Sequence, residues 1–217
     1  MLTIYGSLRS RTTRPMWLVY ELGIPFKRIP VVPVHQASKP EAAGLLHTRS
    51  PEFLRINPNA RVPSIEDDGV VLYESMAINL YLASKHGGPL APANLAEDGL
   101  MTMWSLWAAT EVEPYSINIV YHRVANPKGA MDPRIADQAV ESLRAPFAVL
   151  DKALAKDGFL VGGRFTVADI NVSEIVRYAG TAPELFEVYP RVKAWHEACK
   201  ARPAFKKMCA EREAEPA

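Results

Sequence analysis

The chain contains little cysteine and no long apolar run, and both shortages exclude classes of protein. Cys199 and Cys209 are the only cysteines in 217 residues, which argues against a disulfide framework, a Cys-x-x-Cys redox pair and a cysteine-rich zinc site. The five histidines show no His-x-x-x-His spacing, so we predict no metal site. No stretch approaches the roughly 20 apolar residues of a membrane-spanning helix, and no secretion leader precedes the first strand pattern. We therefore expect a cytoplasmic protein without a membrane partner.

An excess of charge of one sign is also missing. Lysine and arginine together number 25 and the acids 24, for a formal net charge of +1, and both signs are mixed along the chain. Such a balance offers no attraction to a phosphate backbone, so we expect no nucleic-acid partner. Apolar residues make up 48% and charged residues 23%, the composition of an ordinary globular protein with enough chain for one large or two small domains.

The first 86 residues alternate strand and helix signals. Strands and helices are expected at residues 2–5, 13–22, 26–31, 62–65, 70–73 and 76–85. Gly23 and Pro25 end the first helix. The polar stretch 34–55 is too long for a simple connection and is predicted to hold a short helix around residues 40–46. The order β-α-β followed by β-β-α is therefore predicted for a domain at residues 1–86.

After residues 87–96, where glycine and proline cluster, every periodic segment is helical. Helices are expected at residues 97–124, 133–156, 167–179 and 191–201, with a last short one after Pro203. Pro114 and Pro146 fall inside two of them and are expected to kink or split them. The second domain is therefore predicted to be all-α and to cover residues 96–217.

One helix start in this second part is unusually clear. Thr166 and Asp169 have the spacing of a capping box, and Phe165 with Ile170 has that of a hydrophobic staple. A catalytic carboxylate at Asp169 is the alternative, which we reject because a cap accounts for the whole pattern.

A hairpin that contains a proline is the most informative motif of the chain. Asp68-Gly69 between two apolar runs predicts a tight turn between strands. Pro63 cannot donate a hydrogen bond to the ladder, so it belongs at an edge or in a special turn, and a cis peptide bond is plausible there. The amide and carbonyl of Val62 would then face outward and could bind an extended peptide as an added strand does.

Glu74 and Ser75 stand where the second strand of this hairpin gives way to a helix. Free N–H groups at a helix start bind a carboxylate, and Glu74 can bind an ammonium group. Together with Val62, these groups predict a site for a small zwitterionic peptide.

At these residues the chain resembles the glutathione transferase superfamily, in its cytosolic, serine-type form. Members of that superfamily carry an Asn-Pro-x-x-x-Val-Pro strand and a Glu-Ser helix start that hold glutathione, and residues 57–63 with Glu74-Ser75 match both. Further matches lie at residues 163–169, Tyr189-Pro190, Trp195 and 202–204. The resemblance covers nearly the whole chain. It implies an α/β thioredoxin-like N-terminal domain and an all-α helical-bundle C-terminal domain, with glutathione bound by Val62, Pro63, Glu74 and Ser75.

A glutathione-dependent enzyme must stabilise the thiolate of its substrate, whose thiol pKa lies near 8.5. The resemblance implies that a serine four residues before an arginine does so, and Ser10 has this relation to Arg14. Ser7, Thr12 and Thr13 remain alternatives, because a hydroxyl at a helix start is usually a cap. Tyr5 ranks below Ser10, since it lies within the strand pattern, and Arg14 is expected to be structural.

The remaining site residues are predicted less directly. Arg61 and His47 are candidates to bind the glycine carboxylate of glutathione. A small hydrophobic electrophile is expected between the domains, against an apolar helix stripe in which Trp104 is a weaker candidate. The predicted lining residues of the electrophile pocket are Leu8, Trp107, Glu111 and Tyr115.

The predicted function is a glutathione transferase that uses glutathione as substrate and no metal. A glutathione-dependent isomerase, dehalogenase or disulfide reductase on the same scaffold, or a non-catalytic binding module, remains the alternative. The resemblance also implies a homodimer, in which part of the stripe from Met101 onward, including Met103, would be interface.

Overall fold

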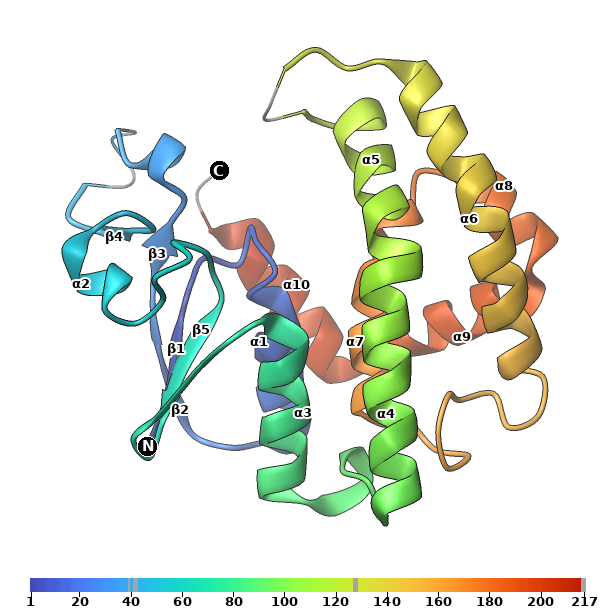
Figure 1. Ribbon diagram of the computed structural model, residues 1–217, viewed down its shortest axis with the longest axis horizontal. Helices are drawn as coiled ribbons and strands as arrows, with labels where there is room; N and C mark the ends of the chain where they lie inside the picture. Colours follow the sequence, from blue (N-terminus) through green and yellow to red (C-terminus); the bar gives the residue numbers. More distant parts are fainter. Residues whose placement is uncertain (39, 41–42, 127–128, 216–217) are drawn as a thin grey trace. The chain divides into compact units, whose positions relative to one another are not determined.

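The computed structural model describes residues 1–38, 40, 43–126 and 129–215 (Figure 1). These residues form two compact units. The first unit is Met1–His86 together with Pro203–Ala217, and the second is Gly87–Arg202. The mixed sheet of the first unit and the helices of the second confirm the predicted fold class, a thioredoxin-like α/β domain followed by a helical domain.

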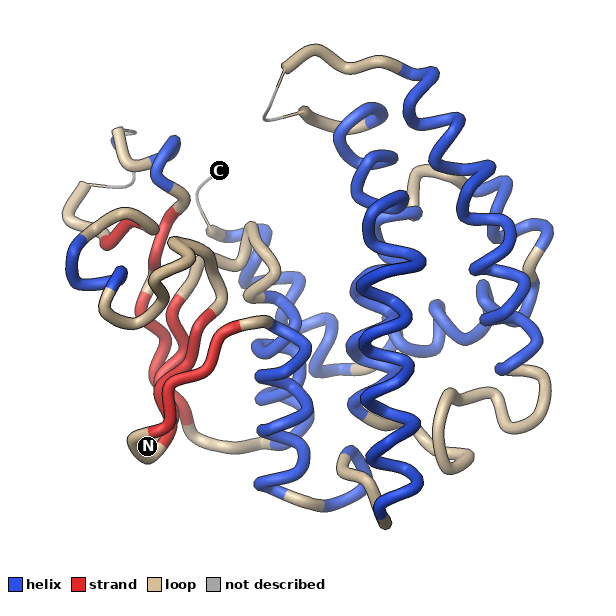
Figure 2. Tube along the Cα trace, viewed as in Figure 1, coloured by secondary structure: helices blue, strands red, loops and turns tan. Residues whose placement is uncertain are grey.

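The first unit is built on a four-stranded sheet, and its strands are drawn red in Figure 2. The strand order is β2-β1-β5-β6. Its strands are β1 (Leu2–Tyr5), β2 (Phe26–Ile29), β5 (Ser64–Asp67) and β6 (Val70–Tyr73). β1 is parallel to β2 and antiparallel to β5, and β5 and β6 form the predicted hairpin. The turn residues Asp68 and Gly69 have φ of 49° and 85°, the left-handed conformation that a tight two-residue turn requires.

Two helices of the first unit begin and end close to their predicted bounds. Helix α1 (Thr13–Leu22) ends at Gly23, whose φ of 64° makes it a left-handed cap. Helix α3 (Ser75–His86) follows β6 directly. The helices pack against each other, and Trp17 of α1 and Ile78 of α3 are fully buried.

The connection between the two halves of this unit differs from its prediction. The predicted strand 26–31 is divided into β2 and β3 (Val31–Val32), and β3 pairs in parallel with β4 (Leu46–His47). A 3₁₀ turn, η1 (Val34–Gln36), and helix α2 (Pro51–Leu54) complete the segment. The short helix predicted around residues 40–46 falls partly outside the described residues.

Helix α10 (Pro203–Ala214) packs on α1 and so belongs to the first unit. The rings of Trp17 and Phe205 meet edge to face with centroids 4.8 Å apart. The Tyr20 hydroxyl donates to Glu211 Oε2 at 2.6 Å. The second unit therefore ends earlier than the expected all-α domain 96–217, because α10 packs on the N-terminal unit.

The second unit is helical within its described residues. Its elements are η3 (Gly88–Leu90), α4 (Leu95–Trp107), the π-helical segment η4 (Ala108–Val112), α5 (Glu113–Arg123), α6 (Pro133–Ala153), α7 (Val167–Val176), the 3₁₀ turn η5 (Arg177–Ala179), α8 (Pro183–Val188) and α9 (Pro190–Ala201). The predicted helix 97–124 is divided just before Pro114, as expected, whereas α6 continues as one helix through Pro146. The six-residue helix α8 was not predicted.

The predicted capping box is confirmed at the start of α7. Asp169 is fully buried, and its carboxylate accepts hydrogen bonds from the Thr166 amide at 2.8 Å and from Trp195 Nε1 at 2.8 Å. The Thr166 hydroxyl and the Leu160 amide donate to the same group at 3.1 and 3.2 Å. Burial raises the pKa of the Asp169 carboxyl, against the effect of these donors. Asp169 therefore holds helix α7 in place.

Candidate functional site

The strand register brings three distant segments to one end of the sheet. Tyr5, the last residue of β1, lies opposite Ser64, the first of β5, and Ser64 lies opposite Tyr73, the last of β6. The loop after β1, the Val62-Pro63 pair and the Glu74-Ser75 pair each continue from one of these residues. The predicted glutathione-binding groups and the predicted thiolate-stabilising loop therefore begin in one row of the sheet.

The Val62-Pro63 peptide bond is cis, in agreement with the expectation from the sequence. Pro63 is buried, and within the described part of the chain neither the amide nor the carbonyl of Val62 has a hydrogen-bond partner. Asn57, which is 2% exposed, supports the segment because its Nδ2 donates to the Arg61 carbonyl at 2.8 Å and to Ser64 Oγ at 3.2 Å. Asn57 belongs to the predicted motif, but its hydrogen bonds to Arg61 and Ser64 were not foreseen from the sequence.

Glu74 occupies a conformation that is unfavourable for a residue with a side chain. Its φ is 72°, and the residue is exposed, while Ser75 begins α3 and is buried. The Ser75 hydroxyl accepts a hydrogen bond from the Arg14 guanidinium at 3.0 Å. Arg14 is only 1% exposed, as expected for a structural arginine. Left-handed backbone in a non-glycine residue often marks a binding site, and here it presents a carboxylate beside a helix start.

The loop between β1 and α1 is held together by its own hydroxyl groups. Ser10 Oγ donates to the Ser7 carbonyl at 2.6 Å and accepts from the Thr12 amide at 3.1 Å. The Thr12 hydroxyl lies 2.8 Å from Ser10 Oγ, and the Thr13 hydroxyl donates to the Ser10 carbonyl at 3.3 Å. A side chain at Gly6 would place its Cβ 2.1 Å from Thr12 Oγ1, so only glycine permits this close turn.

Two alternatives to Ser10 have distinct environments. Ser7 is 6% exposed, and its hydroxyl has no hydrogen-bond partner among the described residues. Tyr5 is 9% exposed, and its hydroxyl donates to Glu66 Oε2 at 3.3 Å. Burial and the neighbouring Glu66 raise the pKa of Tyr5. The Tyr5 proton is thus engaged elsewhere, whereas the Ser7 hydroxyl keeps its hydrogen-bonding capacity.

The remaining predicted residues of the first unit are found in different surroundings. Arg61 is exposed, and His47 lies in β4 with its Nδ1 accepting from the Arg49 amide at 3.2 Å. Leu8 is fully buried. Its backbone amide donates to Glu215 Oε2, from the segment that follows α10. Sequence reasoning missed this contact, which joins residues 207 positions apart.

The predicted pocket residues of the second unit span three helical segments. Trp107 ends α4, Glu111 lies in η4, and Tyr115 lies in the first turn of α5 and is 38% exposed. Trp104 is 8% exposed and meets Trp107 edge to face, with centroids 5.0 Å apart. A π-helical segment therefore interrupts the expected regular stripe, and such segments are frequent at functional sites.

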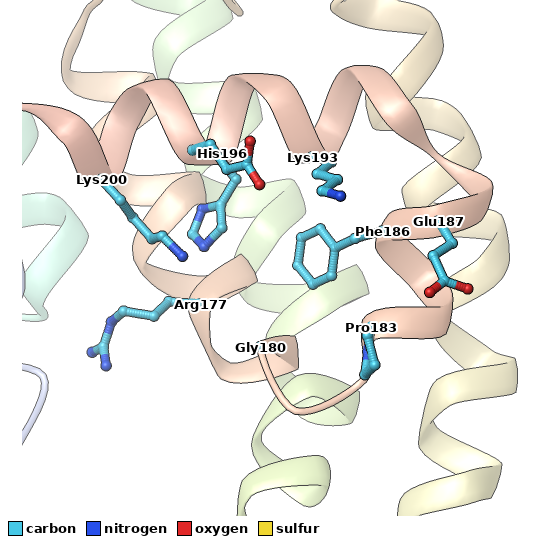
Figure 3. Close-up of a pocket in the computed structure, with 9 residues that line it drawn as sticks. Arg177, Gly180, Pro183, Phe186, Glu187, Lys193, His196 and Lys200 are labelled. Atoms are coloured by element: carbon cyan, nitrogen blue, oxygen red, sulfur yellow. The ribbon is translucent and has the colours of Figure 1, made fainter.

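A separate cavity of about 360 Å³ lies within the second unit, between η5, α8 and α9. Figure 3 shows Lys200, His196 and Phe186 turned toward the same space. His196 Nδ1 lies 2.9 Å from Ser173 Oγ, and its ring stacks on Phe186 at 5.8 Å. Burial, followed by the charge of Lys200, lowers the pKa of His196 to about 3, so the ring is neutral. No residue predicted for the glutathione site lines this cavity.

In the described part of the chain, no group of three or more histidine, cysteine, aspartate or glutamate residues is arranged to hold a metal ion. Over the same residues, none of the helices has the length and apolar character needed to cross a membrane.

Fold and geometry define a thioredoxin-like unit that carries the Val62 backbone and the exposed Glu74 carboxylate at one end of its sheet, together with a helical unit. Residues 1–84 match the family "Glutathione S-transferase, N-terminal domain", and residues 132–198 match "Glutathione S-transferase, C-terminal domain". Glutathione S-transferase 3 of Zea mays is 32% identical, over 96% of this chain and 93% of its own length. The chain belongs to the glutathione S-transferase family.

Solved structures agree with this assignment. Glutathione transferase F7 from Populus trichocarpa superposes with a TM-score of 0.84 and 27% identity, over 98% of this chain and 99% of its own. The theta class glutathione S-transferase from Xanthomonas axonopodis pv. citri, solved with glutathione bound, has a TM-score of 0.79 and 27% identity, over 95% of each chain.

Proposed function

We propose that the protein is a glutathione transferase whose first unit binds glutathione at Val62, Glu74 and Ser75. The observation that carries the proposal is the backbone of Val62, which has no partner among the described residues and precedes β5 at the end of the sheet where the exposed Glu74 follows β6. An extended peptide can pair with Val62 as a strand, and its ammonium group can pair with Glu74. Family membership supports glutathione as that peptide.

Ser10 is our proposed thiolate-stabilising residue. It lies in the loop that continues β1, and its hydroxyl is already fixed by Thr12 and the Ser7 carbonyl. On binding, the hydroxyl would turn from the Ser7 carbonyl to the sulfur and lower the pKa of the bound thiol. The thiolate then attacks the electrophilic carbon, the sulfur–carbon bond forms and the leaving group departs. The serine supplies a hydrogen bond that is strongest when the sulfur carries charge.

The electrophile remains a prediction in its class, a small hydrophobic molecule bound near Trp107, Glu111 and Tyr115. Arg61 and His47 stay candidates for the glycine carboxylate. A two-fold symmetric dimer is proposed from the family resemblance, with the exposed Met103 at its interface, whereas Met101 is fully buried in its own unit. Sedimentation equilibrium measures this directly, and a mass near 24.0 kDa at micromolar concentration would remove the dimer.

The proposal is tested by pairing binding with turnover. Calorimetry is expected to show glutathione binding in the micromolar to millimolar range, as for enzyme substrates in general. Ser10→Ala is expected to lower turnover of a model aryl halide by roughly tenfold to a thousandfold with little change in binding, because one donor to the sulfur is lost.

Ser7→Ala is the matched control, since it removes a neighbouring buried hydroxyl from the same loop. An unimpaired Ser10→Ala beside an inactive Ser7→Ala would transfer the role to Ser7. Absence of binding heat and of thermal stabilisation at tens of millimolar glutathione would refute the function itself. A panel of electrophiles separates the transferase from an isomerase, a dehalogenase or a disulfide reductase.

A further inference from the structure

A carboxylate from the segment after α10 lies against the loop that follows β1. Glu215 Oε2 accepts hydrogen bonds from the backbone amides of Leu8 and of Arg9, the latter at 3.3 Å. Glu215 Oε1 accepts from the Arg28 guanidinium at 2.5 Å. The side chains of Glu215 and Arg28 are only 14% and 25% exposed. All four residues belong to the first unit, so this is an almost buried anion with three donors.

The donors are arranged by the fold of the unit itself. Arg28 lies in β2 opposite Ile4 of β1, and its guanidinium also approaches the Gly6 carbonyl at 3.5 Å. Leu8 and Arg9 follow in the turn that leaves β1. Successive backbone amides directed at one point form an anion-binding concavity, and a guanidinium beside it adds full positive charge. The site therefore has its own structure and suits a carboxylate.

The carboxylate that fills this site comes from a residue outside the helices that hold the unit together. Helix α10 is fixed on α1 by the Tyr20 and Phe205 contacts described above, and its last residue is Ala214. Glu215 lies beyond that end. Its backbone is held by Arg9, whose Nε donates to the Glu215 carbonyl at 2.8 Å. If Glu215 leaves, a second guanidinium, that of Arg9, becomes available to an incoming anion.

We propose that Leu8, Arg9 and Arg28 form a binding site for the carboxylate of an acidic electrophile, and that Glu215 fills this site in the free protein. The proposal deepens the proposed function and rests on it, since Ser10 follows Leu8 by two residues, or at most about 7 Å of extended chain. A rigid aromatic acid whose carboxylate replaces that of Glu215 would lie against the loop that carries Ser10, the proposed thiolate-stabilising residue. Because Glu215 competes for this site, only acids that bind more strongly than its carboxylate would replace it.

The first experiment measures the site without glutathione. 4-Methylbenzoate, an unreactive aromatic carboxylate, is titrated by calorimetry into the wild type, Glu215→Ala and the matched control Glu213→Ala. Glu213 is exposed, and Arg9 reaches its backbone carbonyl, which the substitution retains. Removal of a tethered competitor is expected to lower the dissociation constant by about tenfold in Glu215→Ala alone. Adding Arg28→Gln to Glu215→Ala should abolish the gain.

The second experiment measures specificity with two benzylic chlorides that differ in one group. 4-(Chloromethyl)benzoate carries the carboxylate, and its methyl ester does not. In both reactions the sulfur–carbon bond forms as chloride leaves with the electrons of the carbon–chlorine bond. In Glu215→Ala, kcat/KM is expected to rise about tenfold for the acid and to stay within about twofold for the ester.

The two experiments separate this proposal from the proposed function. Equal benzoate affinity in the wild type, Glu215→Ala and the double variant would overturn the carboxylate site, whatever the enzyme activity. An equal rise for acid and ester would make Glu215 a general obstruction and would also overturn it. Benzoate binding that follows the expected pattern in a protein that binds no glutathione would retain the site and refute the transferase. If Glu215→Ala folds poorly, both experiments are repeated with a variant that lacks residues 215–217.

Discussion

Asp169 of the second unit and Glu215 of the first are both carboxylates that accept several hydrogen bonds, yet their surroundings differ in one respect. Every donor to Asp169 comes from residues packed inside the same helical unit, and its side chain is completely buried. The donors to Glu215 are two backbone amides of the loop after β1 and the guanidinium of Arg28 in β2, while Glu215 itself lies beyond the end of a helix. Hydrogen bonds to a carboxylate therefore stabilise the fold at Asp169, whereas at Glu215 they hold a carboxylate in the proposed binding site.

The two units also differ in how their other polar groups are paired. The buried polar groups of the second unit, such as His196 with Ser173 and Asn171 with Ser105, find partners within that unit. The first unit presents the backbone of Val62 without described partners. Backbone groups without a protein partner remain available to a ligand, which agrees with the proposed role of Val62 in binding glutathione. Substitutions should consequently affect stability in the second unit and affinity in the first.

The largest effect is expected from Asp169→Asn. The amide keeps one acceptor and turns a donor toward groups that themselves donate, which leaves buried hydrogen bonds unmade. The free energy of unfolding should fall by about 3 kcal/mol, as measured by urea denaturation. Asp137→Asn, at a 69% exposed partner of Arg123, is the control and should change stability by less than about 0.5 kcal/mol. Folded Asp169→Asn should bind glutathione like the wild type. Weakened binding would contradict the expectation that substitutions in the second unit affect stability and not affinity.

A smaller effect is expected from pH at His196, again in the second unit. Its pKa is about 3 when folded and near 6.5 when unfolded, so the unfolded state binds the proton in between. The stability that the protein has with His196 buried and neutral is fully present above pH 6.5, and it is lost as pH falls toward 3. When pH falls from 7.5 to 5, His196 should lower the free energy of unfolding by roughly 2 kcal/mol.

His196→Asn should flatten that dependence when urea denaturation is compared at the two pH values. The groups around His196 are Ser173, Phe186, Lys200 and the Glu174–Arg177 pair. His35→Asn, at an exposed histidine, provides the control and should leave the pH dependence unchanged. An unchanged dependence in His196→Asn as well would show that His196 is not the group responsible.

The smallest effect is expected from Glu74→Gln in the first unit. The amide retains the shape but loses the charge that is proposed to bind the ammonium group of glutathione. The dissociation constant measured by calorimetry should rise by about tenfold, because the loss of one exposed charge-assisted hydrogen bond costs about 1.4 kcal/mol. Unfolding free energy should not change. Glu52→Gln removes another exposed carboxylate of this unit and should leave both quantities unchanged. If Glu74→Gln lowered the free energy of unfolding and left the affinity for glutathione unaltered, the expectation that first-unit substitutions affect affinity would be wrong.

Local signals account for what could be predicted from the sequence. Helix Thr13–Leu22, strand Leu2–Tyr5 and the Asp68-Gly69 turn are specified by residues next to one another, and the structure has them at those positions. The capping box at Thr166 is equally local. The glutathione motif was recognisable because its parts lie within one hairpin and the following helix.

Long-range packing accounts for what was missed. Nothing near Pro203 indicates that the last helix packs on α1, because its partner Trp17 is far away in sequence. The separation of β3 from β2 depends on pairing with Leu46 and His47. The carboxylate of Glu215 and its donor Arg28 are 187 residues apart, so no spacing rule could join them.

The return of the chain to its first unit has a consequence for biosynthesis. A ribosome delivers β1 to α3 early, but the helix that covers Trp17 and Tyr20 emerges only after the whole second unit has been made. At ordinary translation rates the delay is on the order of 10 s. During that time the nascent first unit carries an uncovered aromatic surface, which a chaperone or the ribosome itself can shield. The part of the protein that is synthesised first is thus the part completed last.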